Sequence, residues 1–187
     1  MPLPFPAPRV PIHTREVTCH GYRRTDGLWD IEARMTDSKS YTVHNDHRTV
    51  DAGAPFHDMA LRVTVDDTLL IAAVEACIDA APHRICPAVT PNFQRLVGLR
   101  IEPGFASEAR RRLGGVHGCT HLVELIGPLA TAAIQTIHPL RRGAPCADAA
   151  ARPTQIDTCH ALDATGDVVA KYWPRFHKRV DSVQPSR

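Results

Sequence analysis

The residues best suited to chemistry gather in the run GGVHGCTH, directly before the longest apolar helical pattern of the chain. Cys119 and His121 lie two residues apart there, and the glycines let the backbone approach a ligand closely. Together with the free N–H groups of a helix N-terminus, these residues suit metal ligation, anion binding or an activated thiolate. A structural interpretation stays open, in which Cys119 is a small buried residue, His121 caps the helix and the glycines end the preceding helix.

A second candidate is the run Phe56-His57-Asp58-Met59, which opens a predicted strand. Successive side chains on a strand point to opposite faces, so only one of His57 and Asp58 can face Cys119. If it is His57, then His57 and His121 are candidate ligands or a candidate acid and base, because imidazole titrates near neutral pH. The alternative is a histidine that packs at the end of a strand without a chemical role.

A third candidate is the proline-bounded loop IDAAPHRICP, which carries Asp79, His83 and Cys86. Loops at a transition from strand to helix often project functional groups, so Asp79 is a candidate catalytic residue. Cys86 is a candidate ligand of a single zinc or iron ion, together with Cys119 and His121. The wide separation of the two cysteines is not a ligand spacing, and a protein without any metal remains the alternative.

The fourth candidate group is basic and aromatic. Arg23 and Arg24 are able to hold a substrate carboxylate through paired hydrogen bonds, and Trp29 is able to flank a ring. Tyr22 offers a hydroxyl for catalysis. A solvated strand face with arginine–glutamate pairs across the strands is the competing interpretation.

These candidates must be positioned by strands first and helices later in the chain. Alternation of apolar residues predicts strands at 13–24, 28–37, 59–65 and 69–78. Helical periodicity predicts helices at 91–97, 107–113 and 120–137, the last kinked or broken at Gly127-Pro128. A final β pair is predicted at 156–162 and 168–173. This order predicts an α+β fold, an antiparallel sheet of β-hairpins with helices packed on one face.

Three segments are predicted along the chain. Residues 1–12 form a proline-rich extended arm, because prolines at this density oppose helix and strand. Residues 13–173 form a single α+β domain, with polar loops at 38–55 and 141–154. Residues 174–187 form a basic flexible tail.

Length and composition narrow the classes of function. The chain has 187 residues, 43% of them hydrophobic, and a net charge of +2, which gives little support to a nucleic-acid groove. No stretch approaches the roughly 20 apolar residues of a membrane span, and the N-terminus does not resemble a signal peptide. We therefore expect a cytoplasmic protein with a small-molecule partner and a possible homodimer. The 11 histidines are the unusual feature.

Several runs of the sequence resemble a bacterial family known as domain of unknown function 2889. They are CHGYRRTDGLWDIEARMTD, FHDMALRVTVDD, IDAAPHRICP, LVGLRIEPGF and GCTHLVELIGPLATAAIQT. The resemblance implies a small protein of bacterial aromatic catabolism, associated with removal of formaldehyde from lignin-derived aromatic diols. A fainter likeness of motif order concerns U-type iron–sulfur-cluster scaffold proteins, but Phe56 stands where their first cysteine is expected.

Two hypotheses of function follow. The first is a carbon–carbon lyase that acts on a small aromatic substrate by acid–base chemistry, with or without a metal, through His57, His121, Asp79 and Tyr22. The alternative is a non-enzymatic carrier of a metal or an iron–sulfur cluster, or an accessory protein that docks a larger enzyme.

Overall fold

A computed structural model describes residues 3–141, 152–153 and 155–179. The chain divides into two compact units, Met1–Arg141 and Arg142–Arg187, so the domain predicted at 13–173 crosses their boundary. Residues 3–12, in the predicted arm, are exposed and contain no helix or strand. Most of the loop predicted at 141–154 and residues 180–187 of the predicted tail lie outside the described residues.

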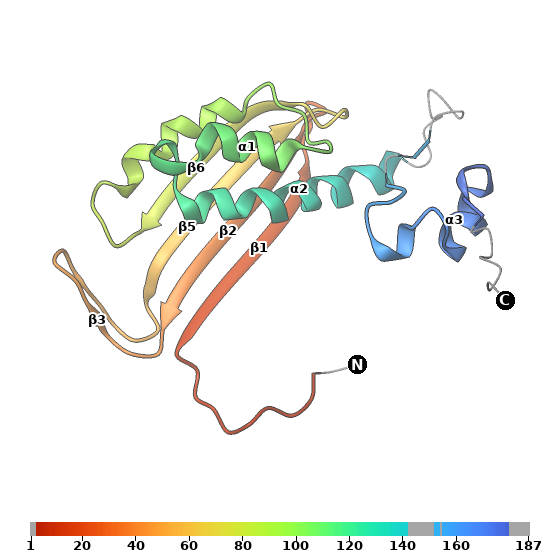
Figure 1. The fold of residues 1–187 in the computed structure, drawn as a ribbon. Helices are drawn as coiled ribbons and strands as arrows, with labels where there is room; N and C mark the ends of the chain where they lie inside the picture. The colour runs from red at the N-terminus through yellow and green to blue at the C-terminus, as the bar shows by residue number, and fades with distance from the viewer. Residues whose placement is uncertain (1–2, 142–151, 154, 180–187) are drawn as a thin grey trace. The chain divides into compact units, whose positions relative to one another are not determined.

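The first unit is built on a four-stranded antiparallel sheet with the order β1-β2-β5-β6 (Figure 1). Its strands are β1 (His13–Arg23), β2 (Trp29–Lys39), β5 (Pro55–Val65) and β6 (Ile71–Ala80). The polar segment between β2 and β5 forms a small hairpin of β3 (Val43–His44) and β4 (Thr49–Val50). The predicted hairpins are thus confirmed, and the strands that carry the candidate residues lie next to one another.

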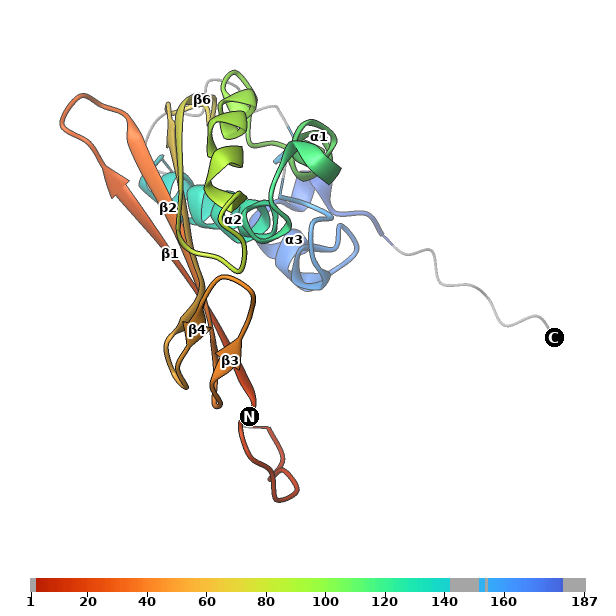
Figure 2. The same cartoon turned by 90° about the vertical axis from the view of Figure 1, so that its left-hand side faces the viewer.

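Helices cover one face of this sheet, as the edge-on view in Figure 2 shows. They are η1 (Cys86–Leu96), α1 (Phe105–Leu113), η2 (Gly115–His117) and α2 (Thr120–Arg141). The α+β fold is therefore as predicted. The segment predicted as a helix at 91–97 belongs to a longer 3₁₀ run, and α2 runs on through Gly127 and Pro128 without a break. Pro128 is exposed, as is Glu124, whose carbonyl loses its helical partner to the proline and can bond to water instead.

The core lies between the sheet and these helices. Alternate residues of β2 and β5 point toward the helices and are almost fully buried, as the period of two predicts. They meet apolar residues of α1 and α2, and the centre of this core includes Ile31, Leu61, Phe93, Leu125 and Leu129. The opposite face of the sheet has no helix of this unit upon it (Figure 2).

The second unit is small and helical in its described part. It contains η3 (His160–Leu162), α3 (Asp167–Tyr172) and η4 (Pro174–Phe176), around a cluster of Ile156, Ala164 and Val169. The β pair predicted at 156–162 and 168–173 is therefore wrong. Alternation over so few residues does not distinguish a strand from one turn of amphipathic helix.

Candidate functional site

A polar cluster interrupts the buried row of residues at one end of the sheet. Asp37 lies near the end of β2 and faces His57, near the start of β5, as a direct cross-strand pair. Both continue the row of inward-pointing core residues that contains Met35 and Met59, so both point toward α2. Asp37 and His57 are buried, which is uncommon for such side chains and requires hydrogen-bond partners.

Asp37 has partners on β1 as well as His57. Arg15 donates to both carboxylate oxygens, with Nε to Oδ1 and Nη2 to Oδ2 both at 2.8 Å. His13 Nε2 lies 3.2 Å from Oδ1, and Arg15 also contacts Glu124 of α2 at 2.6 Å. The hydrogen bonds from Arg15 are the main reason that the pKa of Asp37 falls to about 2. Asp37 is therefore a carboxylate at any ordinary pH.

This carboxylate decides the state of His57. His57 Nδ1 lies 2.8 Å from Asp37 Oδ2, and an ionised carboxylate only accepts, so the proton of the imidazole sits on Nδ1. Burial lowers the pKa of His57, although the hydrogen bond to Asp37 acts in the opposite direction. At neutral pH the ring is thus uncharged, and its Nε2 carries a free lone pair. This is the state that a general base needs.

His121, in the first turn of α2, completes the group. Its ring centroid lies 4.0 Å from that of His57, with 36° between the ring planes. Its Nδ1 lies 3.9 Å from the sulfur of Cys119, which also contacts Met59 at 3.8 Å. Phe56 packs edge-on against His57, with a centroid distance of 4.9 Å. His121 and Phe56 are half-exposed, so the pair of imidazoles lies at the edge of the core rather than inside it.

The same group offers potential metal ligands. Asp37, His57 and His121 each present one ligand atom within 4.8 Å of the others, and across the described ranges they are the grouping of three that does so. The predicted ligand set of Cys86, Cys119 and His121 does not form such a group among the described residues. Because Arg15 and His57 already engage both oxygens of Asp37, the carboxylate fits the role of orienting His57 better than that of a direct ligand.

A family model described as a protein of unknown function, DUF2889, matches residues 13–135, which is most of the first unit. The chain belongs to this family. No curated protein and no solved structure matches this chain, so the likeness to iron–sulfur scaffold proteins receives no support. The part that matches the DUF2889 family contains Asp37, His57 and His121 but none of the second unit's helices.

The remaining predicted site residues of this DUF2889 protein lie elsewhere. Tyr22 is exposed and near His20, on the face of the sheet opposite to the helices, and Asp79 lies beside Cys77 on the same face. Arg24 forms ion pairs with Asp26 and Asp30 in and beside the β1–β2 turn. These residues do not meet the histidine pair.

Trp29 is a core residue rather than part of an open substrate site. It is 4% exposed, and its indole N–H donates to Asp67 at 2.9 Å. Arg23 lies over its ring at 5.5 Å, which is a cation–π contact. Arg24 and Trp29, two of the three residues predicted to hold a substrate, are therefore already engaged with other residues of the protein.

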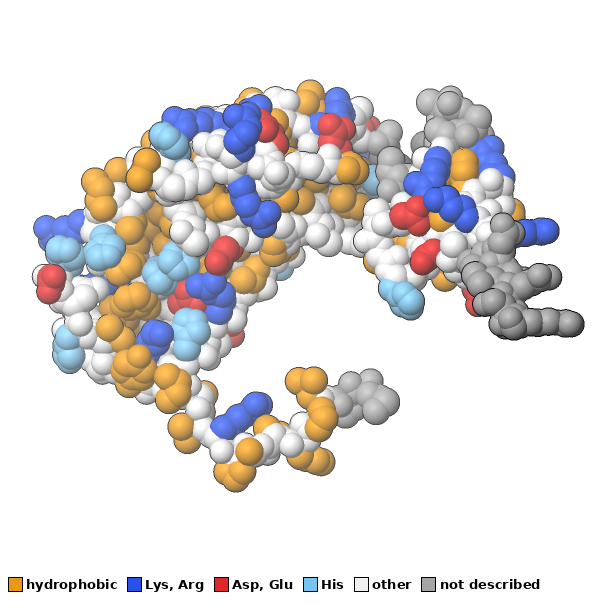
Figure 3. Space-filling view, in the orientation of Figure 1, with side chains coloured by type: hydrophobic (Ala, Val, Ile, Leu, Met, Phe, Trp, Pro, Cys, Tyr) orange, Lys and Arg blue, Asp and Glu red, His pale blue; other side chains and the backbone are white. Residues whose placement is uncertain are grey.

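Sequence reasoning missed three members of the cluster, namely His13, Arg15 and Asp37. A signal for Asp37 was present, because it continues the inward row of the predicted strand at 28–37, where an unpaired charge is costly. His13 and Arg15 follow from the register of the first hairpin, which places Arg15 directly opposite Asp37. Figure 3 shows histidine side chains gathering toward the end of the sheet from which the β3–β4 hairpin extends.

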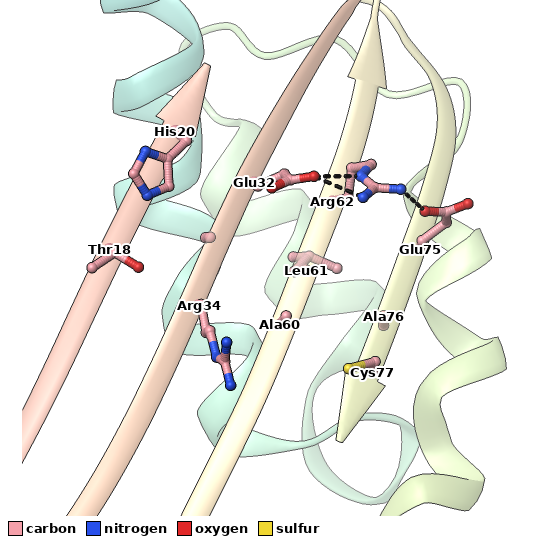
Figure 4. Close-up of a pocket in the computed structure, with 11 residues that line it drawn as sticks. Thr18, His20, Glu32, Arg34, Ala60, Leu61, Arg62, Glu75, Ala76 and Cys77 are labelled. Atoms are coloured by element: carbon pink, nitrogen blue, oxygen red, sulfur yellow. Dashed lines mark hydrogen bonds and ion pairs between the residues drawn. The ribbon is translucent and has the colours of Figure 1, made fainter. Parts of the chain in front are cut away.

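The open face of the sheet carries a shallow cavity of about 480 Å³, shown in Figure 4. Arg62 crosses it as a bridge between Glu32 and Glu75, with distances of 2.7 and 2.5 Å. Thr18 and His20 border it from β1. Its charged side chains are paired, Arg62 with the two glutamates and Arg34 with Asp58, and no carboxylate is hydrogen-bonded to the ring of His20 in the described chain. The contact of an oriented histidine with a second histidine is on the helix-covered face.

Proposed function

We propose that this protein is a small lyase in which His57, oriented by Asp37, acts as general base and His121 as proton donor. The observation that carries the proposal is the chain of contacts from Asp37 through His57 to His121, with 2.8 Å in the first step and 4.0 Å between ring centroids in the second. A carboxylate that fixes the tautomer of a histidine is a recurring device of acid–base catalysis.

The substrate we propose is an aromatic diol derived from lignin, which is what the family resemblance implies. Phe56 and Met59 border the histidines and supply apolar surface for a ring. In the proposed reaction, Nε2 of His57 removes the hydroxyl proton of the terminal hydroxymethyl group. The carbon–carbon bond to this group then breaks and formaldehyde leaves. The electron pair forms a carbon–carbon double bond, and the neighbouring hydroxyl departs as water with a proton from His121.

The test is formaldehyde release from a panel of aromatic 1,3-diols by the purified protein. His57→Gln removes the base, so we expect kcat to fall by about 100-fold or more. Asp37→Asn changes the partner that fixes the tautomer and should lower kcat strongly as well. His117→Gln is the matched control, because His117 is exposed, lies four residues before His121 and should leave the rate unchanged. Equal activity of the wild type and His57→Gln, or no release from any diol, would contradict the proposal.

A second candidate function is metal binding by the same two histidines, which the grouping of their ligand atoms with Asp37 favours. In this arrangement Asp37 would hold His57 from behind while His57 Nε2 and His121 bind a single zinc or iron ion. Metal content of the protein as purified tests it, with His57→Gln and His121→Gln beside the wild type. Near-stoichiometric metal that both variants lose would favour this function, and unchanged metal content would exclude it.

A further inference from the structure

A second cavity, of about 210 Å³, lies between two loops that are more than 30 residues apart in the chain. One wall is the tip of the β3–β4 hairpin, with His47 and Arg48. The other is the end of β6, with Asp79, and the segment that follows it, with His83 and Arg84. This cavity is distinct from the group of Asp37, His57 and His121, none of which lines it.

The two walls are fastened together by side chains. Oδ1 of Asn45 accepts hydrogen bonds from the backbone N–H groups of His47 and Arg48, both at 2.9 Å, which shapes the hairpin tip. The amide nitrogen of the same Asn45 reaches the carbonyl of Pro82 on the other wall, at 3.4 Å. The rings of His47 and His83 meet edge to face, with centroids 6.2 Å apart. The cavity is thus held open by its own loops before any ligand arrives.

Arginine and histidine make up four of the five polar residues in its lining, and the two arginines have unused donors. Arg84 is exposed, and its side chain makes no ion pair or hydrogen bond with any described residue. Arg48 donates through Nη2 to the carbonyls of Pro55 and Phe56, while its buried Nε has no partner in the described chain. The exposed guanidinium of Arg84 is therefore the donor that an incoming ligand can reach directly.

The charge of the lining sets the kind of ligand. Two arginines, Arg48 and Arg84, and one carboxylate, that of Asp79, line the cavity, so it keeps an excess positive charge. His47 and His83 add further donors. Arginine forks match the planar or tetrahedral oxygens of carboxylates and phosphates. We propose that this cavity binds the carboxylate or phosphate group of a small ligand.

Titration of the full chain with inorganic phosphate and, separately, with benzoate tests the site, followed by calorimetry or by NMR of the histidine signals. We expect saturable binding of at least one anion. Arg84→Ala should weaken it by about tenfold or more, since it removes a charged donor. Asp79→Asn should strengthen it, because the opposing carboxylate is gone. Preference for phosphate or for benzoate identifies the group that the ligand carries.

Arg110→Ala is the control for loss of charge alone, because Arg110 is exposed on α1, away from the cavity lining. It should bind as the wild type does. Absence of saturable binding of both anions would overturn the proposal. So would equal weakening of binding by Arg84→Ala and Arg110→Ala, or weaker binding by Asp79→Asn. None of these readouts depends on lyase activity, so the proposed function can fail while anion binding at this cavity stands.

Discussion

The two faces of the sheet use the same ion pair, an arginine with a carboxylate, in different surroundings. On the helix-covered face Arg15 holds Asp37, whose side chain is 2% exposed. On the open face Arg62 bridges Glu32 and Glu75, whose side chains are 36% and 69% exposed. In the buried pair, Arg15 keeps Asp37 ionised, and the ionised carboxylate fixes the tautomer of His57. Water screens the second pair, which is left with a modest role in holding strands together.

The largest expected effect on the free energy of unfolding comes from removing a packed side chain on the helix-covered face. Ile31 is fully buried among core residues, so Ile31→Ala should destabilise the protein by about 3 kcal/mol through lost burial and an unfilled cavity. Urea unfolding followed by circular dichroism measures it. A cost below about 1 kcal/mol would mean that the helices do not pack on this face as described.

Asp37→Asn should have the next largest effect, about 2 kcal/mol at pH 7. It leaves His57 without an anionic partner and Arg15 with Glu124 alone, and Arg15 is partly exposed, which limits the loss. The size agrees with a pKa that falls from 3.8 to about 2 on folding. An unfolding free energy equal to that of the wild type would contradict the role of Asp37 as the centre of the cluster.

The same linkage predicts how stability depends on pH. The pKa of Asp37 is lowered by folding, so its contribution is present above pH 4 and is lost as pH falls toward 2. Burial lowers the pKa of His57, so the unfolded chain binds its proton first and stability starts to decline below about pH 6.5. Urea midpoints from pH 7 to pH 3 measure both. Asp37→Asn should flatten the acid part of the curve.

The smallest effect is expected on the open face. Glu32→Gln removes the negative charge from one of the two ion pairs of Arg62, and exposed pairs of this kind contribute at most about 1 kcal/mol. The loss should shrink further in high salt, whereas the effect of Asp37→Asn should persist there. A cost for Glu32→Gln as large as that for Asp37→Asn would remove the distinction between the two faces.

The strands and the side of the sheet that is buried could be predicted from the sequence, because apolar residues alternate clearly in β2 and in the centre of β5. Trp29, Ile31, Ala33 and Met35 repeat with a period of two, and each is buried. The segment at 168–173 has β-branched and aromatic residues too, but only Val169 needs to be buried there, and one helical turn achieves this. The strand preference of these residues was therefore outweighed by the packing of Val169 in the cluster of the second unit.

The site could be predicted in part. The pairing of His57 with His121 is one of two interpretations that the sequence leaves open, and the structure brings the two rings to a centroid distance of 4.0 Å. Asp37 and Arg15 required the register of two adjacent hairpins, which depends on turns and a bulge after Asp37. Cys86 could not be excluded as a ligand from sequence, because its distance from His121 depends on how the 3₁₀ run of η1 packs against β6.

The order of the strands has a kinetic consequence. Every pairing in the four-stranded sheet joins strands that follow one another along the chain, interrupted only by the small β3–β4 hairpin. Such short-range contacts close at low entropic cost and form early in folding. His121 belongs to a helix more than 60 residues after His57 and arrives only when that helix docks. We expect a nascent chain to complete its sheet before His57 and His121 come into contact, so that the proposed site is assembled only when folding of the first unit is finished.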